Sequence, residues 1–82
     1  MKIVLDSVVE THHYQRRIRL KQGPQIKAKG EKFHVKEIVM IWPEGGDYEQ
    51  VVCRGKAGGV WHRKAYSRDK MPNWLKAVVE GA

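Results

Sequence analysis

The sequence predicts an α+β domain that is mainly β: an antiparallel meander of four to five strands with one short C-terminal helix packed on the sheet. Along most of the chain, apolar and polar residues alternate with the two-residue period of a strand. Only the end of the chain changes to helical spacing. With 82 residues, we expect one domain (residues 1–82) of marginal stability, and a homodimer that hides further apolar surface stays open.

The first strand material lies at residues 3–9, which are rich in β-branched side chains, and at residues 14–20, which alternate. In the second run, Tyr14, Arg16, Ile18 and Leu20 share one register, and Gln15, Arg17, Arg19 and Lys21 share the other. The residues between the two runs include no Gly, Pro or Asn for a tight turn. We therefore expect one long, kinked or bulged strand, with two separate strands as the alternative.

Residues 22–32 contain Gly23-Pro24 and Gly30 with few apolar anchors, which predicts a mobile, solvated loop. The following run, residues 33–42 (FHVKEIVMIW), is predicted to be the central strand. Its second half, residues 38–42, is apolar in both registers, so both faces should be covered.

A hairpin loop is predicted at residues 43–47 (PEGGD), followed by a strand at 48–54. A loop centred on Gly45-Gly46 pairs Glu37 with Arg54, Ile38 with Cys53, Val39 with Val52 and Met40 with Val51. A second turn at 55–59 leads to a strand at 60–66, for which one register places Glu49 opposite Lys64.

The C-terminal helix is predicted from an apolar stripe formed by Trp74, Leu75, Val78 and Val79. Asp69 is a candidate cap, although the proline at position 72 also favours a start near Pro72. Gly81 is a plausible stop. A helix this short needs the sheet for support, so its tryptophan should cover the central strand.

The positive charge is concentrated in two blocks. Of the net charge of +7, residues 12–36 carry +7 and residues 54–70 carry +5, whereas residues 37–53 carry −4. Two cationic strips result, one of which includes Arg54, Lys56, Arg68 and Lys70. Cations interleaved with aromatic side chains are typical of sheets that bind single-stranded nucleic acid. The predicted binding residues are Arg16, Arg17, Arg19, Lys21, Trp61, Arg63, Lys64 and Tyr66.

Two structural interpretations compete with this one, since Tyr14 could belong to the core and Trp61 could be buried under the helix. A different function is also open: a small effector could bind an acidic protein surface, on a host or phage protein, through an exposed sheet edge or a tryptophan.

Enzymatic chemistry is not predicted. The soft ligands His12, His13, His34, His62 and Cys53 lack zinc-site spacing, and Cys53 lies in an apolar strand as a buried thiol would. A Cys53–His62 couple has no third, orienting group. We expect no catalytic residue, no metal and no cofactor. Without a signal peptide or membrane span, and with one cysteine, the expected location is the cytoplasm.

The C-terminal segment, WHRKAYSRDKMPNWLKAVVEGA, resembles small accessory proteins of actinobacterial phages. Many of these have a β-rich body followed by a proline, a tryptophan and a short Leu/Val helix, matched here by Pro72, Trp74, Leu75 and Val79. The resemblance covers about a quarter of the chain. It implies a phage or prophage origin and the host cytoplasm, and it assigns no binding residue. The order of strands before a helix is also similar in layout to the PC4/Whirly single-stranded DNA binders.

Overall fold

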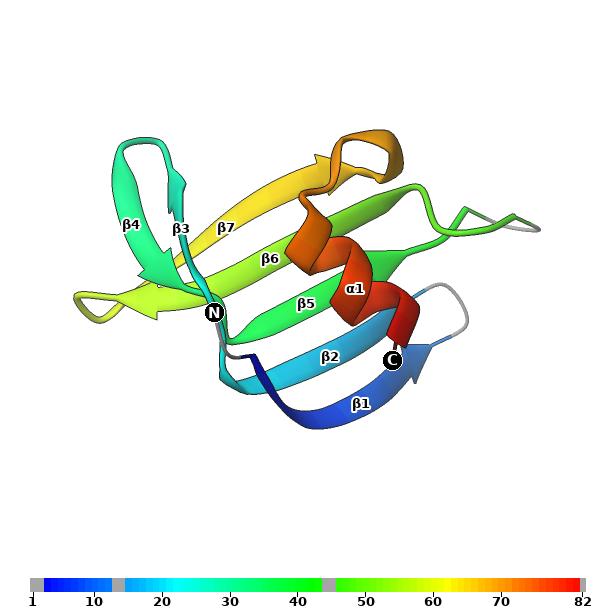
Figure 1. Ribbon diagram of the computed structural model, residues 1–82, viewed down its shortest axis with the longest axis horizontal. Helices are drawn as coiled ribbons and strands as arrows, with labels where there is room; N and C mark the ends of the chain where they lie inside the picture. Colours follow the sequence, from blue (N-terminus) through cyan, green and yellow to red (C-terminus); the bar gives the residue numbers. More distant parts are fainter. Residues whose placement is uncertain (1–2, 13–14, 44–45, 82) are drawn as a thin grey trace.

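The computed structural model describes residues 3–12, 15–43 and 46–81, and it confirms the predicted fold class. A five-stranded antiparallel sheet has the order β1-β2-β5-β6-β7, and β3 and β4 form a second, two-stranded sheet (Figure 1). The strands are β1 (Val4–His12), β2 (Gln15–Gln22), β3 (Gln25–Ala28), β4 (Glu31–His34), β5 (Glu37–Ile41), β6 (Gln50–Ala57) and β7 (Val60–Ser67). A 3-10 turn, η1 (Arg68–Lys70), precedes the helix α1 (Asn73–Gly81).

The central strand is β5, third of the five, and Ile38, Val39 and Met40 are buried on both of its faces as expected. The predicted strand 33–42 is nevertheless two strands, because β4 and β5 belong to different sheets. Between them the chain changes partners: the Val35 N–H donates to the Pro24 carbonyl and the Lys36 N–H to the Arg54 carbonyl. Alternation alone cannot show such a change, since both strands keep the same period.

The register predicted between β5 and β6 is confirmed, including Glu37 opposite Arg54 and Val39 opposite Val52. The register that paired Glu49 with Lys64 is wrong, because Lys64 lies opposite Cys53. Strand β6 continues through residues 55–57, which the sequence assigned to the turn, so the turn is shorter and the pairing shifts.

The N-terminal segment is two strands, so the expected single long strand is wrong. Strands β1 and β2 are antiparallel, and Val8 pairs with Ile18. One strand through residues 3–20 would span about 60 Å at ~3.3 Å per residue. The longest extent of the molecule is 38 Å. The connection at residues 13–14, and with it Tyr14, lies outside the described residues.

The loop predicted for residues 22–32 is also wrong, since β3 and β4 form a hairpin there. Its turn uses two positive φ angles, 52° at Lys29 and 84° at Gly30. Ile26 and Ala28 alternate with lysines and pack against the core, which explains why the segment is ordered. An alternation over four residues does not by itself predict a strand when Gly and Pro lie on either side of it.

The helix α1 covers one face of the sheet (Figure 1). Its Leu75 and Val79 are fully or nearly buried, and each stabilises the fold by about 1.5–3 kcal/mol. The helix begins at Asn73, as the proline suggested, and the Pro72 carbonyl accepts hydrogen bonds from the N–H groups of Leu75 and Lys76. The capping role considered for Asp69 is therefore wrong, because Asp69 lies in η1.

Replacing Gly55 by alanine should destabilise the fold. A Cβ atom on Gly55 would collide with the His34 carbonyl oxygen and lie 2.7 Å from Cδ2 of Phe33, where β4 crosses β6. We expect Gly55→Ala to lower the free energy of unfolding by about 1–3 kcal/mol or more, the usual cost of overpacking. Urea unfolding measures this. Gly81→Ala, whose Cβ meets nothing within 4 Å, is the control and should not destabilise; equal stability of both variants would contradict the packing described.

Candidate nucleic-acid interface

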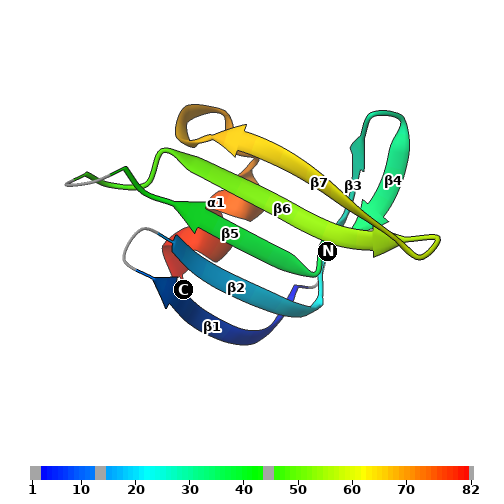
Figure 2. The ribbon, with the colours of Figure 1, turned by 180° about the vertical axis from the view of Figure 1, so that it is seen from behind.

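The sheet face opposite α1 is not covered by any helix or strand of the described chain (Figure 2). We call it the open face. Strand pairing orders its side chains in rows that run across the strands. The rows are Gln15, Ile41, Gln50 and Ser67; then Arg17, Val39, Val52 and Ala65; then Arg19, Glu37, Arg54 and Arg63; and last Lys56 with Trp61. The open face thus changes from neutral polar to apolar to cationic along the strands.

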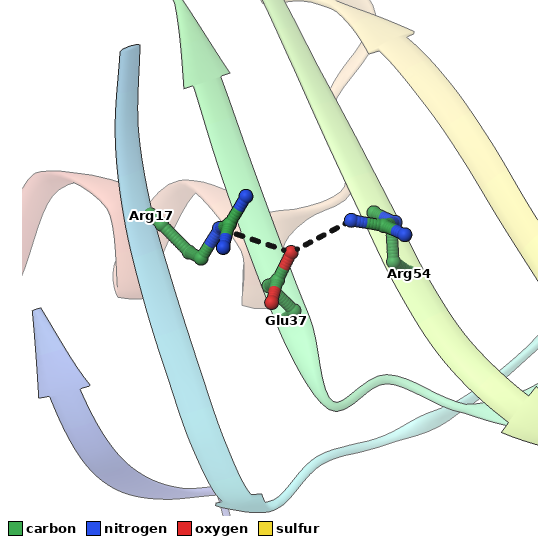
Figure 3. Close-up of polar contacts among 3 residues, drawn as sticks. All are labelled: Arg17, Glu37 and Arg54. Carbon is green, nitrogen blue, oxygen red and sulfur yellow. Dashed lines mark hydrogen bonds and ion pairs between the residues drawn. The ribbon is translucent and has the colours of Figure 1, made fainter. Parts of the chain in front are cut away.

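Glu37 of the cationic row forms an ion-paired triad with Arg54 of the same row and Arg17 of the neighbouring row, drawn in Figure 3. The Arg54 Nη1 atom donates a hydrogen bond of 3.1 Å to Glu37 Oε1, and Arg17 Nε lies 3.2 Å from the same oxygen. The Glu37 side chain is only 12% exposed, against 30% for Arg17 and 39% for Arg54. One largely buried carboxylate therefore pairs with two guanidinium groups that are themselves partly exposed.

Trp61 is the large aromatic side chain of the open face, and half of it is exposed. Arg54 Cζ lies 5.2 Å and Lys56 Nζ 5.8 Å from the indole ring centroid, distances typical of cation–π contacts. These contacts hold the indole among cations. The alternative interpretation, in which Trp61 is buried under the helix, is wrong, because the β6–β7 register places Trp61 on the opposite face and half of it is exposed.

In the described part of the chain, two hollows indent the open face. The Trp61 hollow, of about 320 Å³, is lined by Asp6, Arg19, Leu20, Lys36, Glu37 and Trp61. The valine hollow, of about 290 Å³, is lined by Gln15, Arg17, Val39, Ile41, Gln50, Val52, Arg54 and Arg63. They share no lining residue, and the Arg17–Glu37–Arg54 triad is the partition between them.

Seven of the eight predicted binding residues divide between the two faces. Strand pairing brings Arg17, Arg19, Trp61 and Arg63 to the open face, whereas Lys21 lies at a shift of the β1–β2 register, outside the four rows. Arg16, Lys64 and Tyr66 are in the opposite register, on the side of the helix. Since neighbours on a strand point to opposite faces, Arg16 with Arg17 and Arg63 with Lys64 cannot form one surface.

The three residues on the helix side have structural partners. Arg16 Cζ lies 5.7 Å from the Trp42 ring centroid, and Lys64 Nζ donates a 3.2 Å hydrogen bond to the Lys27 carbonyl. Tyr66 packs against the core, and burial raises the pKa of its hydroxyl. These three side chains therefore make contacts within the fold, on the face opposite the cations of the open face.

Arg54, Lys56 and Glu37 were missing from the predicted binding residues. The sequence contained the information needed to include them. The predicted pairing of Glu37 with Arg54 also fixes which residues of β6 share a face with Glu37. The valine hollow, with Gln15 and Gln50 on either side of Ile41, could not be seen without the full strand order.

Other chemistry has little support in the described part of the chain. No group of three His, Cys, Asp or Glu side chains there is placed to hold a metal ion. Cys53 is fully buried, as predicted, and burial raises the pKa of its thiol to about 12. A thiol with so high a pKa is a poor nucleophile. Of the helices described, none combines the length and the apolar character needed to cross a membrane.

Comparison of the chain with protein-family profiles, with curated proteins and with solved structures gave no significant match.

The buried thiol predicts a loss of stability in alkali. The thiol ionises near pH 9 when the chain is unfolded and near pH 12 when it is folded, so its contribution is complete below pH 9 and falls as the pH rises from 9 to 12. We expect the free energy of unfolding to fall by up to about 1.4 kcal/mol per pH unit from this group. Urea unfolding at several pH values measures it, with Cys53→Ala as the control. An identical slope in that variant would contradict the assignment.

Proposed function

We propose that this chain is a non-enzymatic module that binds nucleic acid through the open face. The observation that carries the proposal is the alignment of Arg19, Arg54 and Arg63 in one row beside the exposed Trp61. Guanidinium groups bind phosphate oxygens, and an exposed indole offers a surface for a base. Groups that bind phosphate and a group that can stack on a base thus occur together on one face.

The charges on this face are close enough to act together. Adjacent strands are about 4.8 Å apart, and adjacent rows on the same face are about 6.6 Å apart. Both spacings are shorter than the Debye length of ~8 Å at physiological salt. Five cations of the four rows face the single carboxylate of Glu37. A field of one sign over this area attracts a polyanion and speeds its association.

Charge variants test the proposal. Among the described residues, Arg19 and Arg63 have no ion-pair partner, so Gln substitutions remove phosphate contacts with little effect on folding. Each phosphate contact contributes about 0.7 to the salt dependence of single-strand binding, so Arg19→Gln/Arg63→Gln should lower the slope by about 1.4 and weaken binding. Fluorescence anisotropy with a labelled oligonucleotide at several salt concentrations measures both.

The matched control is Lys29→Gln/Lys32→Gln, which removes the same charge from the exposed β3–β4 hairpin. It should leave the slope nearly unchanged. Glu37→Gln has the opposite sign: it releases Arg17 and Arg54 for phosphate and should tighten binding. Equal losses in the open-face and hairpin variants, or no binding of any oligonucleotide even at low salt, would refute the proposal.

A second candidate function is a protein interface at the β1 edge. Leu5 and Val8 of this edge strand are each 46% exposed. An apolar groove of about 360 Å³ continues from the strand to the helix and is lined by Ile3, Leu5, Trp74, Ala77, Val78 and Gly81. An unpaired strand edge beside an apolar groove suits a partner that adds a strand and inserts apolar side chains.

The second candidate predicts a partner whose retention depends on this edge. In a pull-down from nuclease-treated host lysate, the wild-type chain should retain a stoichiometric protein that Leu5→Asp/Val8→Asp loses. Arg19→Gln/Arg63→Gln is the control and should retain it. Retention by the edge variant as well would exclude the β1 edge as the interface.

A further inference from the structure

Resting on the function proposed above, we infer that the ligand is a single-stranded nucleic acid that places two unpaired bases in the two hollows, with its backbone crossing the cationic row between them. The order of the rows supports this arrangement. The Trp61 hollow lies at one side of the Arg19–Glu37–Arg54–Arg63 row and the valine hollow at the other. A single-stranded nucleic acid that runs parallel to the β-strands would contact the Trp61 indole first, then the cationic row, and then the apolar floor of the valine hollow.

The Trp61 hollow suits a base better than a phosphate. Its aromatic wall is the half-exposed indole, and two carboxylates, Asp6 and Glu37, also line it. Carboxylates repel a phosphate but accept hydrogen bonds from the amino groups of bases. Every base has a π-face, so stacking on the indole tolerates many sequences. Arg19 and Lys36 at the same hollow are placed for the phosphates beside the stacked base.

The valine hollow has the composition expected of a second base site. Its floor contains Val39 and Val52, which are 8% and 7% exposed although no helix covers them. Gln15 and Gln50 flank Ile41 at its end. Their amides both donate and accept, so they can pair with the edge of any base, whereas a phosphate gains nothing from an apolar floor. The arginine stems around the floor shield its edges from water.

A duplex fits this face poorly. Its base faces are stacked on one another and cannot reach Trp61 or the valines, so only its phosphates would contact the row. The element that stands away from the sheet is the β3–β4 hairpin (Figure 1), with exposed Lys27, Lys29 and Lys32. A two-stranded ribbon can enter a major groove. Duplex binding would therefore be expected to depend on the hairpin lysines and not on Trp61.

The test compares four labelled ligands of equal length, about 12 nucleotides to cover the site of one small domain. They are single-stranded DNA, single-stranded RNA of the same sequence, the DNA duplex, and an abasic strand that keeps the phosphodiester backbone without bases. The wild-type chain should bind one or both base-containing single strands at least about tenfold more tightly than the abasic strand and the duplex. The DNA and RNA arms show which sugar is accepted.

Trp61→Ala should remove most of the preference for strands with bases over the abasic strand, because the remaining affinity comes from phosphates. Trp61→Phe keeps an aromatic face and should retain much of the preference. Titration with the single strand should quench wild-type tryptophan fluorescence, and Trp61→Phe should lose that quenching while Trp42 and Trp74 still emit. Both variants should fold, because the Trp61 side chain is half exposed. Circular dichroism checks this.

The outcomes separate this inference from the proposed function. Equal binding of the abasic strand, or of the duplex, with no effect of Trp61→Ala, would overturn the base sites; nucleic-acid binding would still stand if Arg19→Gln/Arg63→Gln weakened it. Duplex binding lost in Lys29→Gln/Lys32→Gln would also overturn the inference and move the site to the hairpin. No binding of any ligand at low salt would overturn both.

Discussion

The structure depends on packing of α1 against one face of the five-stranded sheet. Leu75 and Val79 form a single buried cluster with Ile18, Ile38 and Cys53, and this cluster is the core of the domain. A nine-residue helix has no stability of its own, so it remains folded only on the sheet. With one helix, only one face can be covered, and the other is left to side chains. The character of the open face follows from that constraint.

The aliphatic parts of arginine side chains shield the apolar row of the open face from water. Val39 and Val52 are nearly buried on a face without a covering element, and Arg17, Arg54 and Arg63 surround them. Long cationic side chains can shield apolar surface with their methylene groups while their charged ends stay in water. Clustered cations repel one another, and the Glu37 carboxylate between two of them reduces that repulsion in the unbound state. Stability and a cationic surface are thus achieved by the same residues.

The sequence was sufficient where local periodicity and turn chemistry agreed. The helix, the central position of β5 and the β5–β6 register were predicted because Pro43 and the glycines after it mark one hairpin, and the apolar pairs on both faces allow one alignment. It was insufficient where the chain changes direction without turn residues, between β1 and β2, or changes partners without losing its period, at residues 35–36. The hairpin at residues 25–34 is the opposite case. There the turn residues predicted a loop, although short strands lie between them.

The candidate site shows the same division at the level of side chains. Cationic composition identified β2 and β7 as candidate binding strands. Only strand alternation decides which of two neighbouring cations reaches the open face, and only the strand order places Arg19 of β2 in one row with Arg63 of β7, across four strands. Glu37 has two opposing effects within that row. It stabilises the sheet by pairing with Arg17 and Arg54, and under the proposed function a phosphate would compete with it for the same guanidinium groups. An acidic residue in the middle of the proposed polyanion-binding surface is therefore consistent with the proposal. Its pairing would favour stability at the expense of affinity, and such an opposition is expected at binding sites.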